Sequence, residues 1–277
     1  KYIRNFRSNL PWFHHQTRNY PHKQGSYQIL HQYHAQGKLS PEQAVFTTLT
    51  RPREQLFDTE KDPHELNNLA EYPEYQAVLR RKREQLNRWQ HEILDLGFMP
   101  ESQWWTRFGV AGDKLDRHSL VRDQPEVYPL SAIMQTADLI DRGSDVLPEQ
   151  IRLLNHSDPA VRYWALQGII AQGSQGRKAM PELRKLINDP VSINRIEAAQ
   201  ALCALGETDP SLNLLIEALN HPQPLIALPA ANALDHLGKI AKPALPEIRA
   251  FVEEAPNTEL LGWQFPKWLL QMTLEKF

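Results

Sequence analysis

The sequence predicts an α+β fold: a small N-terminal part with short antiparallel strands and one long helix, followed by an all-α solenoid. Three observations predict it. Apolar and polar residues alternate in KYIRNF (1–6), which is typical of a half-buried strand. Apolar side chains recur at steps of three and four between Pro73 and Leu96, which indicates an amphipathic helix. From Ser131 onward the sequence repeats with a unit of 32–33 residues.

Between the first strand and the long helix, local signals predict three short elements. Residues 26–36 favour a helix, and Gly37 suits the position just after its C-terminus. Ser40, followed three residues later by Gln43, has the pattern of a capping box and predicts a short helix. Residues 54–58 (EQLFD) predict a second strand.

The stretch LFDTEKDPHELNNLA (56–70) invites a metal-binding interpretation. Three of its carboxylates stand at alternate positions: Asp58, Glu60 and Asp62. A calcium loop of the EF-hand type needs glycine at its sixth position and a bidentate glutamate at its twelfth. Those places hold Pro63 and Leu69. The pattern therefore argues against a calcium loop.

A structural interpretation fits the same residues. Asp62 can cap a helix, Pro63 is compatible with the first helical position, and Glu65 at the third can reach back to the cap. The stretch is predicted to be the corner between a strand and a helix.

The long helix should be followed by a linker. We expect Gly97 to end the helix, RRKRE (80–84) to form its charged side, and residues 99–126 to run along the surface. The pair Trp104-Trp105 is expected to anchor this linker.

The repeat predicts pairs of helices that bury their apolar faces only by stacking. PEQIRLL, PELRKLI and PEIRAFV stand at 148–154, 181–187 and 246–252. The first helices align through Ala165-Leu166, Ala198-Ala199 and Ala230-Ala231. About four helix pairs are expected. The aromatic residues of the tail are expected to cap the end of the stack: Trp263, Phe265 and Trp268.

Composition excludes several classes of function. With 31 basic and 33 acidic residues the formal charge is −2, so the chain lacks the basic excess of a nucleic-acid-binding protein. Its single cysteine, Cys203, rules out an internal disulfide framework and is expected to be a buried core residue. The apolar runs are too short for a membrane span.

Two segments resemble HEAT-like repeats. NHSDPAVRYWAL (155–166) and NDPVSINRIEAA (188–199) are similar to the turn and first helix of such repeats, in which Asp-Pro opens the helix and an arginine follows. Arg162 and Arg195 match that arginine. The third unit has Ala227 there, which weakens any ladder of contacts between repeats.

A second resemblance covers nearly the whole chain. EQLFDTEKDPHELNNLA (54–70) is similar to ELYDLxxDPxExxNLA, the signature of the C-terminal subdomain of type I, formylglycine-dependent sulfatases of the alkaline-phosphatase superfamily. KYIRNF and WQHEILDLGFMPES (89–102) resemble the entering strand and closing helix of that subdomain. VYPLSAIMQTADL (127–139) and the repeats resemble sulfatases with appended HEAT-like units. We therefore expect a sulfatase C-terminal subdomain at 1–98, a linker at 99–126, and a solenoid with a capping helix at 127–277.

This resemblance implies an enzyme that hydrolyses sulfate esters or sulfamates. Such sulfatases use a formylglycine made from Cys or Ser in a Cys/Ser-x-Pro/Ala-x-Arg motif, and a calcium ion held by Asp and Asn. The formylglycine motif and the calcium ligands are both missing from this sequence. Cys203 is followed by Ala-Leu-Gly-Glu, which does not match the motif. Calcium and formylglycine are thus implied for a missing N-terminal catalytic domain of the same polypeptide, and the isolated chain is predicted to be inactive. The resemblance also implies a periplasmic or secreted protein.

The resemblance gives one segment a role at the substrate. In this family the C-terminal subdomain helps to line the pocket, and cationic donors suit a sulfated ligand, a carbohydrate among the candidates. The residues expected to contact it are His14, His15, Arg18, His22 and Lys23. The alternative is a solvated loop. His31 and His34, three apart on a helix, could share a metal but have no evident third ligand.

Two functions remain open on the sequence. The chain starts at Lys1 without an initiator Met or a leader, and a strand at 1–6 with upstream partners leads us to expect a C-terminal fragment of a sulfatase. The alternative is a free-standing α-solenoid that binds a protein partner.

Overall fold

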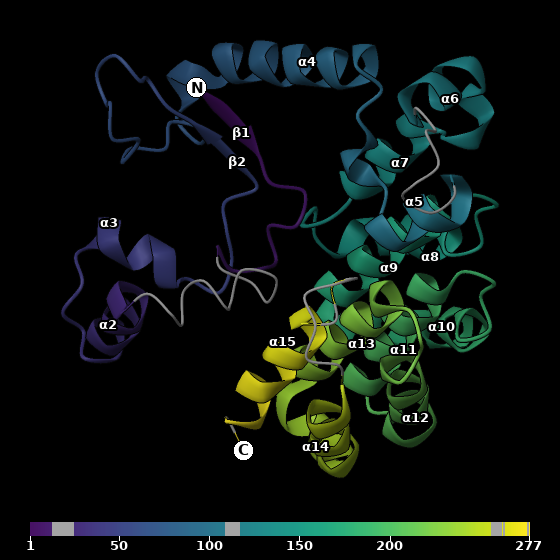
Figure 1. Ribbon diagram of the computed structural model, residues 1–277. Coiled ribbons are helices and arrows are strands. Elements are labelled where there is room, and N and C mark those ends of the chain that lie inside the picture. Colours follow the sequence, from purple (N-terminus) through teal and green to yellow (C-terminus); the bar gives the residue numbers. More distant parts are fainter. Residues whose placement is uncertain (13–24, 109–116, 256–261, 263, 276) are drawn as a thin grey trace. The chain divides into compact units, whose positions relative to one another are not determined.

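The computed structural model describes residues 1–12, 25–108, 117–255, 262, 264–275 and 277 (Figure 1). The chain forms two compact units. Unit 1 consists of Lys1–Leu96 and Val121–Ser131, and unit 2 of Gly97–Leu120 and Ala132–Phe277.

Unit 1 contains a two-stranded antiparallel sheet. β1 (Tyr2–Arg4) pairs with β2 (Glu54–Leu56), with Tyr2 opposite Leu56 and Arg4 opposite Glu54. Both strands are shorter than their sequence patterns predicted. The partner of β1 in this structure is thus a strand of the same chain.

The elements between the strands form as the local signals predicted. α2 spans Gly25–Ala35, and Gly37 follows it with φ 65°, a left-handed conformation that glycine adopts without steric cost. Ser40 and Gln43 form the capping box of α3 (Pro41–Ala44), which continues into η2 (Val45–Thr47). The cap explains why so short a helix begins there.

The long helix forms but ends earlier than expected. After η3 (Pro73–Tyr75), α4 runs over Gln76–Glu92, and Leu94 with φ 50° turns the chain away before Gly97. Leu79 is buried against Leu56 and Ala70. Trp89 and Ile93 are 54% and 40% exposed, so the apolar face of the helix is covered at Leu79 but largely exposed in the C-terminal half. A sheet of two short strands covers only the first turns of the helix.

The segment expected to be a linker is largely helical. It contains α5 (Glu101–Phe108), α6 (Arg117–Asp123) and most of η5 (Pro125–Val127), and η4 (Leu96–Phe98) comes just before it. Gln103 on α5 is fully buried and donates to the carbonyl of Pro159 at 3.2 Å. Trp104 is partly buried, and the side chain of Trp105 lies outside the described residues. Contacts with the repeats hold α5 in place. The sequence of this segment has no apolar periodicity, so the helix was not predicted.

Besides α5, unit 2 contains a stack of helices. They are α7 (Leu130–Ala137), η6 (Ser144–Val146), α8 (Leu147–Leu153), α9 (Pro159–Ala171), η7 (Gly173–Ala179), α10 (Met180–Leu186), α11 (Ser192–Ala204), α12 (Thr208–Leu219), α13 (Pro224–Leu237), η8 (Gly238–Ala244), α14 (Leu245–Glu254) and α15 (Gln264–Leu274).

The repeat pattern predicted this stack correctly. α9, α11 and α13 lie side by side (Figure 1), and α11 contacts both of the others. All six residues of the aligned alanine and leucine pairs are fully buried. Small side chains at these positions let consecutive first helices approach closely, while the second helices contribute Leu183, Leu215 and Ile248 to the core.

α15 closes the end of the stack against α13 and α14. Its buried residues are Pro266, Leu269, Leu270 and Thr273, and Thr273 Oγ1 donates to Asp235 Oδ1 at 2.6 Å. Phe265 is 48% exposed and touches the ring of Trp268, and Trp263 lies outside the described residues. Among the described residues of the cap, Leu269 and Leu270 are thus more deeply buried than Phe265 and Trp268. Of the helices described, none is long and apolar enough to cross a bilayer.

Candidate functional site

The residues predicted to contact substrate lie outside the described part of the chain. His14, His15, Arg18, His22 and Lys23 all fall within residues 13–24. Their role stays a prediction. On the neighbouring helix, His34 Nδ1 lies 2.7 Å from Thr47 Oγ1, so this ring nitrogen is engaged in a hydrogen bond. Among the residues that the structure describes, no three His, Cys, Asp or Glu side chains are arranged to hold a metal ion.

The acidic stretch forms a turn beside β2 and does not start a helix, so the predicted corner is wrong. Asp62 Oδ2 accepts a hydrogen bond from the main-chain N–H of Asn67 at 2.8 Å, and this bond lowers the pKa of the Asp62 carboxyl. The main-chain N–H of Glu65 donates to the carbonyl of Asp62 at 3.1 Å, but the Glu65 side chain does not reach back to the Asp62 main chain as a capping box requires. Glu65 takes φ 55°, which leaves the helical path, and its carboxylate pairs with Lys1 Nζ at 2.8 Å.

Asn68 fastens this turn to β2. Its Oδ1 accepts from the N–H groups of Leu56 and Ala70 at 2.9 and 3.1 Å, and its Nδ2 donates to the carbonyl of Glu54 at 3.1 Å. The N–H of Leu69 donates to the carbonyl of Leu56 at 2.8 Å. The Asn-Leu-Ala ending of the stretch therefore satisfies main-chain groups of β2.

The main-chain groups of β2 that Asn68 and Leu69 bind point away from β1. Phe57 exchanges hydrogen bonds with Lys1, at 2.8 Å through its N–H and 2.7 Å through its carbonyl. Because successive residues of a strand direct their main-chain groups to opposite sides, Leu56 points the other way. Asn68 and Leu69 thus cover the edge of β2 that would otherwise be open.

A triad of side chains connects α4 to the sheet. Arg83 donates from Nε and Nη2 to the two carboxylate oxygens of Glu54 at 2.8 and 2.7 Å, and the Tyr2 hydroxyl donates to Glu54 Oε1 at 2.5 Å. Burial raises the pKa of Glu54, but the hydrogen bonds from Arg83 and Tyr2 outweigh it and hold that pKa below its usual value. Burial and the Glu54 carboxylate raise the pKa of Tyr2.

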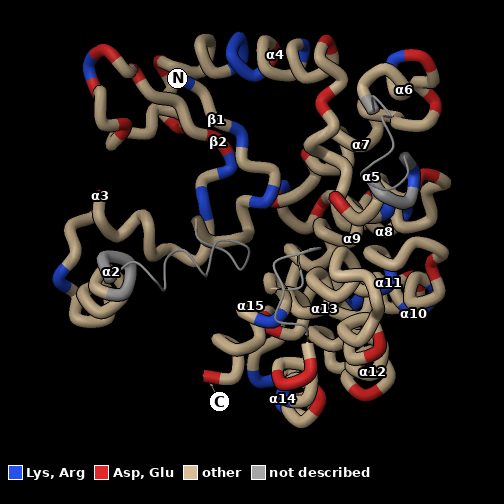
Figure 2. Tube along the Cα trace, in the orientation of Figure 1, with Lys and Arg blue, Asp and Glu red and all other residues tan. Residues whose placement is uncertain are grey.

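Sequence reasoning missed this triad. It placed Arg83 in the charged side of the long helix, and Figure 2 shows the basic run of α4 in blue. No spacing in the sequence relates Arg83 to Glu54, which is 29 residues away. The ion pair arises because α4 packs across β1 and β2.

Cys203 cannot act as a nucleophile in this fold. It is 1% exposed on α11, and burial raises the pKa of its thiol to about 12. Since the thiolate is the reactive form of cysteine, this side chain is inert near neutral pH. The prediction that Cys203 is a core residue is confirmed.

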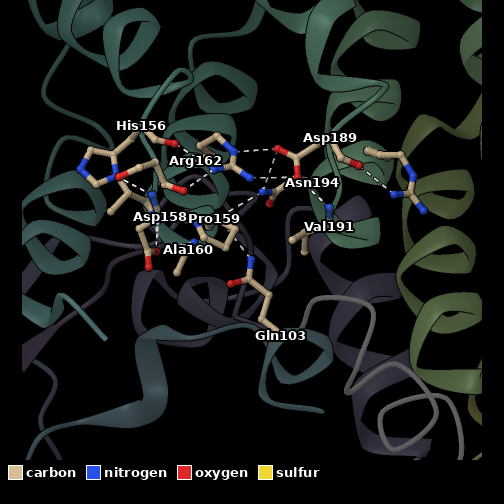
Figure 3. A network of polar contacts seen from close by, with 12 residues as sticks. Gln103, His156, Asp158, Pro159, Ala160, Arg162, Asp189, Val191 and Asn194 are labelled. Atoms are coloured by element: carbon tan, nitrogen blue, oxygen red, sulfur yellow. Dashed lines mark hydrogen bonds and ion pairs between the residues drawn. The ribbon is translucent and has the colours of Figure 1, made fainter. Parts of the chain in front are cut away.

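A buried polar network joins two repeats of unit 2 (Figure 3). Asp158 caps α9 by accepting from the N–H groups of Ala160 and Val161 at 2.8 and 3.3 Å, as the Asp-Pro pattern predicted. Arg107 on α5 pairs with the same carboxylate at 2.9 Å.

The centre of the network is an ion pair between Arg162 and Asp189. Arg162 donates from Nε and Nη2 to the two oxygens of Asp189 at 2.6 and 3.0 Å. Its Nη1 donates to the carbonyls of His156 and Ser157, both at 2.8 Å. Asp189 also accepts from the N–H of Val191 at 2.8 Å. The guanidinium and the carboxylate are thereby paired and hydrogen-bonded, as burial requires.

The second Asp-Pro pair does not cap its helix. Val191 is the N-cap of α11, and Asp189 stands two residues earlier, where it can reach back to Arg162. Arg195 instead donates to the carbonyl of Asp189 and to Ser192 Oγ at 2.8 and 2.9 Å. With Ala227 fully buried at the third arginine position, the pairing is not repeated there. The network therefore joins one repeat to the next through hydrogen-bonded charged groups.

Comparison with known proteins agrees with this helical repeat. Residues 118–203 and 147–231 match the family model of HEAT repeats. The matched residues include the Arg162–Asp189 pair and helices α8 to α12. This part of the chain is therefore similar to HEAT repeats.

One relative adds a different kind of information. The chain is 40% identical over 103 residues to a protein of Formosa agariphila named an ulvan-active sulfatase. The match covers 37% of this chain and 17% of that relative. Most of the relative thus has no counterpart in the aligned segment.

Proposed function

We propose that this chain is the C-terminal part of a sulfatase, in which unit 1 completes a catalytic domain and unit 2 carries HEAT-like repeats. The observation that carries the proposal is the 40% identity over 103 residues with the ulvan-active sulfatase. The proposed substrate class is sulfate esters, with ulvan as the first substrate to test.

The surface of unit 1 supports this proposal. Five large apolar side chains within residues 29–49 are 39–82% exposed: Ile29, Tyr33, Val45, Phe46 and Leu49. Exposed apolar side chains that gather in one short segment mark an interaction surface. A catalytic domain packed against α2, α3 and η2 would remove them from water.

In this proposal the catalytic groups belong to the other domain. Calcium and a formylglycine would supply charge stabilisation and the nucleophile there. The exposed apolar side chains of α2, α3 and η2 would pack against that domain, while Asn68 and the Tyr2–Glu54–Arg83 triad would hold unit 1 itself together. Residues 13–24 keep their proposed role at the substrate.

The test compares the natural gene product that contains this chain with the 277-residue chain alone. Both are incubated with an aryl sulfate and with ulvan oligosaccharides, and the release of sulfate is measured. We expect release by the natural product, loss of release after calcium chelation, and no turnover by the chain alone. Turnover by the chain alone would contradict the proposal that the catalytic groups lie in the other domain. No sulfate release by the natural product would contradict the assignment as a sulfatase.

The match to HEAT repeats supports a second candidate, a free-standing solenoid that binds a protein partner. Reading the coding sequence that precedes Lys1 separates the two. Paired aspartates and a Cys/Ser-x-Pro/Ala-x-Arg motif there favour the sulfatase, and their absence favours the solenoid.

A further inference from the structure

A small apolar pocket opens between two consecutive repeats of unit 2. Its volume is about 170 Å³, and it lies between the C-terminal ends of α9 and α11, beside η7. Ile169, Ala201 and Leu205, each at most 6% exposed, form its floor. Ser174, Arg177 and Gln200 bring polar groups to its rim.

The size of the pocket restricts what can bind. Small-molecule sites occupy roughly 300–1,000 Å³, so this pocket is too small for a cofactor or a drug-sized ligand. Its volume and apolar floor suit one aliphatic side chain. Single buried side chains of this kind act as anchors in protein–protein contacts.

The pocket is built into the fold by a close contact of η7 with α9. A Cβ at Gly176 would lie 2.9 Å from the carbonyl oxygen and 3.2 Å from Cγ2 of Ile169. Only glycine allows this approach without a shift of the backbone. The contact places the next residue, Arg177, at the rim.

The rim carries one positive charge, that of Arg177. This side chain is exposed, and within the described residues it has no hydrogen bond or ion pair. Arg177 Nη2 lies 4.0 Å from the position of a Cβ at Gly206, at the end of α11. The adjacent carboxylate of Glu207 is held by Arg184, whose Nε donates to it at 2.8 Å. The rim is therefore complementary to a negative group.

We propose that this pocket binds a partner protein through a segment that carries an apolar anchor residue next to acidic residues. The anchor side chain fills the pocket, and a neighbouring carboxylate accepts hydrogen bonds from the Arg177 guanidinium. This binding role goes beyond the sulfatase assignment and does not depend on it.

The proposal is tested by fluorescence polarisation with the 277-residue chain and fluorescein-labelled decapeptides. One peptide has a central leucine flanked by aspartates, a second replaces the leucine by alanine, and a third replaces the aspartates by lysines. We expect the first to bind most tightly and to lose affinity as salt is added. Failure of the first peptide to bind up to ~1 mM, or equal binding of all three, would overturn the proposal.

Two variants locate the binding site. Ala204 lines the pocket at an exposed helical position, so Ala204→Leu should fill the pocket and abolish binding while the chain stays folded. Arg177→Gln should weaken binding about tenfold. Ala250→Leu and Arg249→Gln make the same changes at exposed positions of α14 and should leave binding unchanged. Wild-type affinity in either pocket variant, with an unaltered melting temperature, would contradict the assignment.

Discussion

Arg162 on the first helix of one repeat forms a two-pronged ion pair with Asp189 in the turn that opens the next, with Nε–Oδ2 and Nη2–Oδ1 distances of 2.6 and 3.0 Å. The side chains are 11% and 1% exposed. The contact spans 27 residues of sequence and joins neighbouring repeats in register.

Removing one partner of this pair should destabilise unit 2 strongly. Asp189→Ala leaves the buried guanidinium of Arg162 without a carboxylate, and we expect a loss of about 3–5 kcal/mol in the free energy of unfolding. The double variant Arg162→Met/Asp189→Asn removes both charges and should unfold later than the single variant. Urea titration followed by circular dichroism measures both.

A matched control is Arg152→Ala, which removes the exposed pair with Glu149 and should leave the midpoint almost unchanged. If Asp189→Ala behaved like this control, the buried pair would not hold the repeats together.

Asn68→Ala should loosen the covered edge of β2. The change removes hydrogen bonds to Leu56 and Glu54, and we expect a loss of about 1–3 kcal/mol. Asn68→Asp keeps the acceptor for Leu56 but loses the donor to Glu54, so its effect should be intermediate. Hydrogen exchange at the N–H of Leu56 reports the opening directly.

Asn67→Ala is the control for this experiment. The hydrogen bond of Asn67 to Asp62 comes from its main-chain N–H, so the variant keeps it and should lose little stability. Equal effects of Asn67→Ala and Asn68→Ala would show that Asn68 has no special role.

The Tyr2–Glu54–Arg83 triad should make unit 1 sensitive to acid. The folded-state pKa of Glu54 lies below its ordinary value of 4.5, so its contribution to stability is present above that value and is lost as the pH falls through the folded-state pKa. Glu54→Gln removes this titration. We expect the melting temperature of the wild type, minus that of Glu54→Gln, to decrease as the pH falls below about 4.5. A difference that is constant from pH 7 to 3 would contradict the assignment.

The two halves of α4 should respond differently to truncation. Leu79 is 3% exposed, so Leu79→Ala should cost about 2–5 kcal/mol through lost burial and a cavity. Trp89 is 54% exposed, and Trp89→Ala should cost much less although it removes a larger side chain. Thermal unfolding of both variants checks this, and similar losses would mean that the exposed half is covered in solution.

Local signals in the sequence were reliable where the chemistry that they need is local. The capping box at Ser40 and the cap at Asp158 form as predicted, because each depends on residues within one turn. The alanine pairs are buried as predicted because their spacing repeats along the chain. The corner at Asp62 was not predicted correctly. The sequence there has the residues of a helix N-terminus. In the structure Asn68 and Leu69 hydrogen-bond to Leu56 of β2, and these bonds replace those that a helix would make.

The sequence by itself determined the repeat unit, the stacking faces of its helices and the inert surroundings of Cys203, because hydrophobic periodicity and residue size are properties of the chain. Only the tertiary structure decided that Arg83 meets Glu54, that Arg162 pairs with Asp189, and that Gly176 brings Arg177 to the rim of a pocket. Such contacts join segments that are far apart in the chain, or depend on how closely two helices approach. The spacing of residues along the sequence does not determine which remote segments meet or how close two helices come.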